Sequence, residues 1–403
     1  MQVRAVTVGA SAAFDDGVLA LPEQLGPFLA QAHTYFERAG LPVQGMRLAC
    51  QPLAAVTGLT RENTVEYAQA LARVAGILGF GYVSLGPVDA AHLDWIPLLI
   101  EALVNVETAF GSVIVAERGG TVSLEAIAAA VTVIRTLAER TPDGFGNVRF
   151  AALANCPAGI PFFPAGYHEP NTPPRFAVAW EAADLAVDAF SQASTLSDAE
   201  ARLFERVTTE GQRVVAAAEA LARATGVPFA GIDISLAPFP SDDRSIAAAF
   251  ERLGVDWFGA PGTLFVAALI TRVLKRVPLP KTGFCGLMLP VLEDSVLAKR
   301  AIEGRYGLSD LLVWSAVCGL GFDVVPLPGD ITTTELRGLV LDMATLAVTL
   351  DKPLTARLMP LPGKHAGERA VFSFAYFAPA GILAARGGGA QGLFAREGIS
   401  WQG

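Results

Sequence analysis

Short apolar runs rich in Val, Ile and Phe alternate along this chain with longer stretches whose apolar residues recur at helical spacing. This alternation is typical of strand and helix units packed in layers, and it predicts an α/β fold. About ten strands are many for one open sheet, so the pattern favours a barrel or two packed halves, surrounded by helices. The expected strands cover residues 3–8, 46–51, 82–85, 109–115, 148–153, 176–180, 230–235, 286–290, 323–326, 355–359 and 370–376.

Two helix starts are marked by Ser or Thr with Glu three residues later, at Ser197 with Glu200 and at Thr332 with Glu335. In such a capping box each residue satisfies an exposed amide group of the other. Residues 198–225 have the spacing of a long amphipathic helix, which we expect to join two halves. The predicted units are a first half-barrel at 1–195, a second at 196–385, packed with it as one globular unit, and a Gly-rich tail at 386–403.

Composition narrows the partners and the compartment. Of the 403 residues, 52% are hydrophobic and 17% charged, so we expect another subunit to cover part of the surface, as in a homo-oligomer. The net charge of −9 repels phosphate backbones and predicts no nucleic-acid partner. The opening MQVRAVTVGA is typical of a strand, and no uncharged stretch is long and proline-free enough to cross a membrane. Four widely spaced cysteines favour a reducing, cytoplasmic location.

The loop at 154–169 is rich in Pro and Phe and ends in Tyr167, His168 and Glu169. It is too apolar for a solvated loop, so we expect it to pack inward and to present its polar end to a cavity. His168 beside a carboxylate is a candidate catalytic base or metal ligand, and Tyr167 is a candidate ligand contact. The alternative for His168 is a hydrogen-bonded structural histidine.

Asp233 interrupts an apolar strand in GIDISLAPFPSDDRSI, residues 231–246. A carboxylate there is costly unless it is paired, so we predict a buried Asp233 bound by a cation, a metal or several amide donors. Asp233 and Arg244 are candidate substrate-binding residues. For Asp242, which precedes a helix, we favour a capping role.

Adjacent carboxylates at Glu293 and Asp294 follow another apolar strand. Together they could supply oxygen ligands to magnesium or calcium. The alternative is that Asp294 caps the helix that follows. Glu107 and Arg357 are further candidates for ligand contact, although either could form a structural ion pair.

Cys318 is followed by Gly319 and Gly321 and then by Asp323. Glycines allow close approach of backbone amides, which could lower the pKa of the thiol and make Cys318 a nucleophile. The alternative is a buried, inert cysteine. Asp323 is a candidate substrate contact.

Several phrases taken together identify a family resemblance. VRAVTVG at the start, FAALANCPAGIPFFPAGYHE, GIDISLAPFPSDDRS with GAPGT behind it, and SAVCGLGFDVVPLPGD resemble the domain of unknown function 711 family, also called uncharacterised protein family 0210. The resemblance implies a barrel like that of pyruvate formate-lyase, built from two antiparallel-related halves. The tail RGGG lacks the Tyr that follows the radical glycine of those enzymes, so we expect no glycyl radical chemistry here. Cys318 would occupy a loop like the one carrying their thiol.

Three hypotheses for function follow. The first is an enzyme acting on a small polar or anionic metabolite, with Cys318 or His168 as nucleophile or base. The second is a sensing or assembly protein that binds such a ligand without turnover. The third is a divalent-metal-dependent hydrolase or lyase. The catalytic hypothesis requires at least two of Cys318, His168, Asp233 and Glu293 at one cavity.

Overall fold

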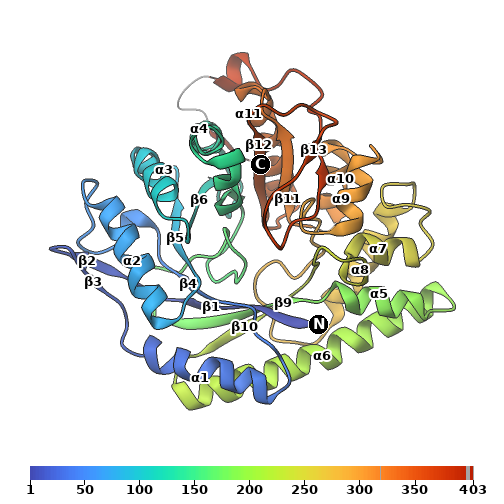
Figure 1. Ribbon diagram of the computed structural model, residues 1–403, viewed down its shortest axis with the longest axis horizontal. Helices are drawn as coiled ribbons and strands as arrows, with labels where there is room; N and C mark the ends of the chain where they lie inside the picture. The colour runs from blue at the N-terminus through green and yellow to red at the C-terminus, as the bar shows by residue number, and fades with distance from the viewer. Residues whose placement is uncertain (318, 396–399, 403) are drawn as a thin grey trace.

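The apolar runs become the strands of one large curved sheet, which the computed structural model describes within residues 1–317, 319–395 and 400–402 (Figure 1). The strands follow each other across the sheet in an order that differs from their order in the chain. That order is β10 (Phe229–Ala237), β9 (Arg175–Glu181), β1 (Gln2–Gly9), β4 (Met46–Ala49), β5 (Tyr82–Val88), β6 (Ala109–Ala116), β8 (Phe150–Ala154), β12 (Leu354–Leu361) and β11 (Gly321–Pro328). Short strands β7 (Thr121–Ser123) and β15 (Ser400–Gln402) pair beside β6, while β2 (Ala13–Asp15) pairs with β3 (Val18–Ala20) and β13 (Arg369–Ala370) with β14 (Ala380–Gly381).

Strand direction divides the sheet into two sets. β1, β4, β5, β6 and β8 are parallel to one another. β9 and β10 at one edge, and β12 and β11 at the other, run opposite to them. Because β9 pairs with both β1 and β10, the two sets meet in one continuous sheet. β9 belongs to the second set, although it lies before residue 195, the predicted end of the first half.

The sheet is not a closed barrel, which corrects the expectation of closure. Its path ends at β10 and β11, and the described ladders do not join these two strands. The irregular segment 280–293 lies between them. It accepts a backbone hydrogen bond from Leu236 at Gly286, 3.4 Å, and donates one from Val291 to Asp323, 3.1 Å. Non-strand chain therefore bridges the two edges.

Two expected strands are wrong. Residues 286–290 lie in the bridging segment, where Pro290 offers no amide and only isolated hydrogen bonds reach the edges. Of residues 370–376, only Ala370 belongs to a strand, although Phe372, Phe374 and Tyr376 alternate with smaller residues. Their rings face a cavity instead of a neighbouring strand. The alternation of aromatic and smaller residues therefore reflects packing around the cavity and not the hydrogen-bond ladder of a sheet.

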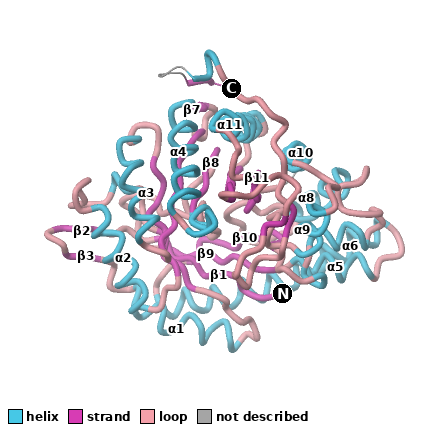
Figure 2. Tube along the Cα trace, turned by 45° about the horizontal axis from the view of Figure 1, so that its top comes forward, coloured by secondary structure: helices cyan, strands magenta, loops and turns pink. Residues whose placement is uncertain are grey.

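Helices cover the outer face of the sheet, as Figures 1 and 2 show. In α4, for example, buried Ile127, Val131 and Ile134 recur every three or four residues and form the apolar face. No described helix is long and apolar enough to cross a membrane. The helices are α1 (Leu25–Arg38), α2 (Thr64–Leu78), α3 (Ile96–Asn105), α4 (Leu124–Arg140), α5 (Ala183–Ser191), α6 (Leu196–Thr225), α7 (Ile246–Arg252), α8 (Thr263–Arg276), α9 (Ser295–Ile302), α10 (Leu308–Val317) and α11 (Thr333–Thr349), with 3₁₀ turns η1 (Leu53–Ala55), η2 (Leu93–Trp95), η3 (Pro142–Arg149), η4 (Asp242–Arg244) and η5 (Gly392–Ala395).

The sequence signals for helix starts were right in one case and displaced in another. Thr332 and Glu335 form the expected capping box of α11. The long helix α6 is present, but its cap is Thr195, which accepts a hydrogen bond from Asp198. At α7 the capping side chain is Ser245, not the expected Asp242.

The inner face of the sheet packs on the loop at 154–169. A second apolar cluster lies here, separate from the core between sheet and helices. Ala151 of β8 and Ala179 of β9 face Ile160 and Ala165 of the loop, and Thr7 donates a hydrogen bond to the carbonyl of Pro161, 2.7 Å. Small side chains on the strands leave room for this inserted loop. Its expected inward packing is thus confirmed.

Candidate functional site

A cavity of about 740 Å³ lies on the inner side of the sheet, beyond the apex of the inserted loop. Arg4, Arg47, Tyr82 and Phe110 reach it from near the amino ends of β1, β4, β5 and β6. Phe162 and Phe163 at the loop apex form part of its wall, together with residues of η3, β11, β12 and the segment 371–378. The cavity therefore collects side chains from both sets of strands.

Charged side chains form a connected cluster in the wall. Glu293 accepts hydrogen bonds from Arg4 and, at 3.1 Å, from Nη2 of Arg357. Asp323 Oδ1 accepts a hydrogen bond from Nε of the same Arg357 at 2.7 Å and forms an ion pair with its Nη2 at 2.6 Å. Arg357 thus links the two carboxylates, which come from different segments of the chain.

The two carboxylates have opposite shifts. Burial raises the pKa of Asp323, and Arg357 only partly offsets this effect. Burial also acts on Glu293, but Arg4 and Arg357 outweigh it and hold the pKa of Glu293 below its usual value. Glu293 therefore keeps its charge more firmly than Asp323 does.

Irregular backbone places two of these side chains. Arg4 is the extra residue where β1 shifts register against β9, between Val3 and Ala5. Asp323 lies at a similar shift in β11, next to Val324, whose φ of 39° is unusual for a β-branched residue. β-Bulges redirect side chains in this way and are frequent beside functional sites. They aim Arg4 and Asp323 into the cavity.

Arg47 differs from Arg4 and Arg357 because its guanidinium makes no hydrogen bond or ion pair with any described residue. It lies over the ring of Phe163, 5.5 Å from the centroid. Burial lowers the pKa of Arg47 to about 10, and the nearby charge of Arg4 contributes in the same direction. Within this cluster three guanidinium groups, of Arg4, Arg47 and Arg357, thus share two carboxylates, and Arg47 is left without an ion pair among the described residues; Glu107 and Arg149 line another part of the cavity.

Asp233 lies away from the cavity wall. It is fully buried and accepts hydrogen bonds from the amide and hydroxyl of Ser235, 3.0 and 2.6 Å, and from the amides of Phe284 and Cys285, 2.7 and 2.9 Å. The prediction of a buried Asp233 with several donors is confirmed. A Cβ at Gly283 would lie 2.2 Å from this carboxylate, so the turn needs glycine. Asp233 fastens the bridging segment to β10.

The polar end of the inserted loop also lies away from the cavity, which corrects our expectation. The apex residues Phe162 and Phe163 line the cavity, while His168 donates its backbone amide to Cys50 beyond the carboxyl end of β4. The His168 ring is buried, with Nε2 3.0 Å from the carbonyl of Thr172. Tyr167 donates its hydroxyl to the carbonyl of Cys156, 3.1 Å.

The remaining candidates divide between the cavity and other contacts. Glu107 and Asp323 line the cavity. Arg244 lies outside its lining, where it pairs with Glu181 at 2.9 Å and stacks on the ring of Phe239 at 3.7 Å. Cys318 lies outside the described residues.

Asp294 caps two helices. Its side chain accepts the amide of Leu297 in α9, as the capping alternative predicted, and also the amides of Ile246 and Ala247 in α7. Glu293 is engaged by two arginines. In the described part of the chain no three His, Cys, Asp or Glu side chains converge as a metal site would require.

The sequence reasoning missed Arg4, Arg47 and Tyr82. Arg4 and Arg47 each interrupt a short apolar strand, in VRAVTVG and MRLA, which is the same signal that drew attention to Asp233. The predicted candidates lie mostly in loops that follow strands, whereas the cavity lies at the amino ends of the five parallel strands. The same signal therefore applies to an arginine within a short apolar strand as well as to an aspartate.

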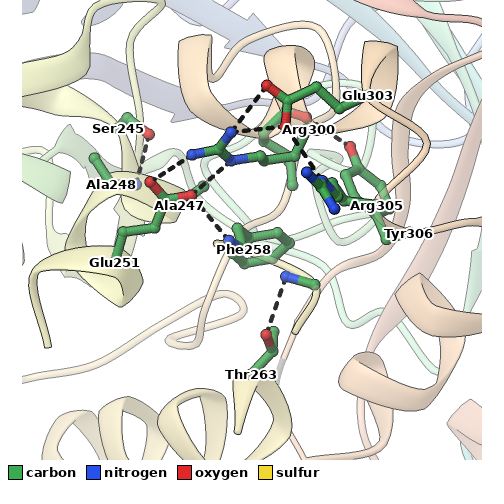
Figure 3. A network of polar contacts seen from close by, with 12 residues as sticks. Ser245, Ala247, Ala248, Glu251, Phe258, Thr263, Arg300, Glu303, Arg305 and Tyr306 are labelled. Atoms are coloured by element: carbon green, nitrogen blue, oxygen red, sulfur yellow. Dashed lines mark hydrogen bonds and ion pairs between the residues drawn. The ribbon is translucent and has the colours of Figure 1, made fainter. Parts of the chain in front are cut away.

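A second charged cluster lies between α7 and α9, outside the lining of the cavity (Figure 3). Arg300 contacts both oxygens of Glu251 at 2.8 and 2.9 Å and both oxygens of Glu303 at 2.9 and 2.7 Å. Glu251 also accepts the amide of Phe258, 2.9 Å. Arg305 stacks on the ring of Trp257, 4.4 Å from the centroid. Each charge in this cluster has partners.

Comparison with known proteins adds a family. The family model described as an uncharacterised ACR, DUF711, matches residues 1–373. A UPF0210 protein of Pyrobaculum islandicum is 31% identical over 399 residues, which covers 91% of this chain and 87% of the relative. UPF0210 proteins of Methanopyrus kandleri and Bifidobacterium longum are 30% and 28% identical over 402 and 357 residues, with 91% and 83% of this chain and 88% and 77% of the relatives covered.

Proposed function

The chain belongs to the uncharacterised DUF711 family, and we propose that it binds a small organic anion in the cavity between its two sets of strands. The observation that supports this proposal is the unpaired guanidinium of Arg47. Arg47 is half-buried, a shielded cation without a counter-charge is costly, and an anionic ligand would supply one. The volume of about 740 Å³ is in the usual range for metabolite sites.

The geometry gives less support to the catalytic residues first considered. Of the four side chains that the catalytic hypothesis required, only Glu293 lines the cavity among those described, since Asp233 and His168 do not. Ligand binding therefore stands ahead of catalysis. The metal-dependent alternative is weaker still, because Glu293 and Asp294 already have other partners.

A binding measurement tests the proposal. Wild-type protein, Arg47→Gln and Arg305→Gln are screened by thermal shift against a panel of carboxylates and phosphates, followed by calorimetry. Arg305 is a matched control because it also stacks on an aromatic ring but lies in the outer cluster. We expect at least one anion to bind wild type and Arg305→Gln, and to lose about tenfold or more in affinity with Arg47→Gln. Equal binding to all three proteins would refute the proposal.

Turnover of the bound anion is a second candidate function, which one observation favours. Asp323 and Glu293 share Arg357, yet their pKa values shift in opposite directions, as in acid–base pairs that divide roles. In this role Asp323 would exchange a proton with the ligand while Glu293 stays ionised. Proton NMR of the bound anion over time tests this role. Asp323→Asn should abolish a chemical change but retain binding; no change with wild type favours a sensing or assembly role.

Three further proposals concern the molecule as a whole. We place it in the cytoplasm, supported by the free thiols of Cys50, Cys156 and Cys285. A homo-oligomer is supported by exposed apolar side chains such as Phe265, 57% exposed, and light scattering would test it. A relation to the pyruvate formate-lyase barrel is supported by the two opposed parallel sets and the bridged edges. Superposition of strand order on those enzymes would test this relation.

A further inference from the structure

We propose that the ligand is a monocarboxylate with an aromatic body, held by its carboxylate at Arg47 and by its ring between two groups of phenylalanines. This inference rests on the proposed anion-binding function and names the class of anion. It follows from the charge count of the cluster and from the walls around it.

The charge count favours a monoanion. Arg4 and Arg357 are engaged by Glu293 and Asp323, whereas Arg47, the third arginine of this cluster, has no ion pair with a described residue. One carboxylate on the ligand neutralises the surplus. A second carboxylate, or a phosphate dianion, would add a negative charge beside the existing Glu293 and Asp323, which is unfavourable in a shielded site.

The inner wall is aromatic. Phe163, under the Arg47 guanidinium, packs against Phe110 with ring centroids 5.3 Å apart, and Phe110 packs against Tyr82 at 5.3 Å. Arg47 and Tyr82 are partners in neighbouring strands, and Tyr82 remains 36% exposed. A guanidinium beside a row of rings that ends in the partly exposed Tyr82 suits a ligand whose charge and ring are close together.

The outer wall is aromatic as well. Phe145 of η3 contacts Phe372 at 5.6 Å, Phe374 at 5.3 Å and Phe377 at 6.0 Å, all from the segment 371–378. Phe372 and Phe374 are only half-buried, so they offer apolar surface to the cavity. A small hydrated anion would leave this surface uncovered, whereas an aromatic body would bury it.

A matched series of probes tests the class. The full chain is titrated with 3-phenylpropionate, its neutral amide, hexanoate, succinate and inorganic phosphate, using wild type, Arg47→Gln, Arg47→Lys and Phe374→Leu. We expect 3-phenylpropionate to bind about tenfold or more tightly than the other four probes. Arg47→Gln should abolish this preference over the amide, Arg47→Lys should restore part of the binding, and Phe374→Leu should weaken 3-phenylpropionate several-fold.

The outcomes separate this inference from the function on which it rests. If succinate or phosphate binds through Arg47 and 3-phenylpropionate does not, the aromatic class is wrong and the anion-binding function stands. If hexanoate binds as tightly as 3-phenylpropionate, the aromatic requirement is overturned. If no anion of the wider panel depends on Arg47, the anion-binding function fails and the inference fails with it.

Discussion

The molecule contains two clusters of arginines and carboxylates that are built differently. In the outer cluster Arg300 binds Glu251 on one side and Glu303 on the other (Figure 3). These hydrogen bonds raise the pKa of Arg300 by more than burial lowers it. In the cavity cluster Arg47 has only an aromatic face, and burial lowers its pKa to about 10. The first cluster is complete within the chain, whereas the second lacks a negative charge.

The difference shows how a structural ion pair can be told from a ligand site. Both clusters consist of arginines and carboxylates and both join distant segments, so composition does not distinguish them, although Glu303 and Arg305 of the outer cluster are exposed. Pairing does distinguish them, because an arginine that serves only stability is expected to have an ion pair within the chain, and Arg47 has none among the described residues. Three predictions test whether this distinction holds, in order of decreasing effect, and a fourth concerns the inserted loop.

Removing the shared carboxylate should have the largest effect. Glu293→Gln leaves Arg4, Arg47 and Arg357 with Asp323 alone, so repulsion joins the loss of two charge-assisted hydrogen bonds. We expect a loss of about 3–5 kcal/mol in the free energy of unfolding. Denaturant titration at neutral pH measures it.

Added salt provides the control for Glu293→Gln. Because the variant has a larger positive surplus than wild type, an anion such as phosphate should recover more stability in the variant. A loss below about 1 kcal/mol would show that the arginines do not depend on Glu293.

Breaking the outer cluster should cost less and leave binding unchanged. Glu251→Gln removes the contacts of Arg300 at 2.8 and 2.9 Å, but Glu303 still pairs with Arg300. We expect a loss of about 1–2 kcal/mol by thermal or denaturant unfolding, with anion affinity equal to that of wild type. A changed affinity would mean that the two clusters are coupled and would weaken the distinction.

Removing the unpaired arginine should cost almost nothing. Arg47→Gln loses a cation–π contact with Phe163 but relieves the repulsion from Arg4 and Arg357, and these effects oppose each other. Without ligand, we expect stability within about 1 kcal/mol of wild type.

The matched variant is Arg357→Gln, which removes an arginine that two carboxylates use. It should be destabilised by about 3 kcal/mol. Equal losses for Arg47→Gln and Arg357→Gln would mean that Arg47 has a structural partner and is not the open position of the cluster.

Much of the fold could be predicted because strand and helix patterns are local. The apolar runs of β1, β8 and β12 can be recognised from a few consecutive residues, and so can the capping box at Thr332. Residues 286–290 show the limit of such reasoning. They have a strand composition, but whether a ladder forms depends on an available edge, which is a property of the whole sheet.

The site was harder to predict, because its parts lie far apart in the sequence. Arg4 and Glu293 are 289 residues apart in the sequence. They meet because the strands of the second set add to both edges of the first set, which brings distant parts of the chain to one cavity. Asp233 was predicted correctly since burial alone dictates that it must find donors. For Arg47 the sequence also shows a charged residue within an apolar strand. Its defining feature, however, is that it has no ion pair among the described residues, and only the structure can show this.

His168 tests the opposite end of the inserted loop, where the expected effect depends on pH. Burial lowers the pKa of His168, and the hydrogen bond to Thr172 offsets this only in part, so the folded protein keeps the ring neutral where the unfolded chain already takes up a proton. Stability should therefore fall as pH drops below about 6.5 towards the lower folded pKa, by at most about 1.4 kcal/mol per pH unit. Unfolding of wild type and His168→Gln is compared between pH 5 and 7, where the other three histidines are exposed in the structure and common to both proteins. The advantage of wild type over the variant should shrink as pH falls, while binding of an anion at Arg47 stays equal in both. A difference that is constant across this range would show that His168 carries the same protonation in both states, and a change in anion affinity would place it at the cavity after all.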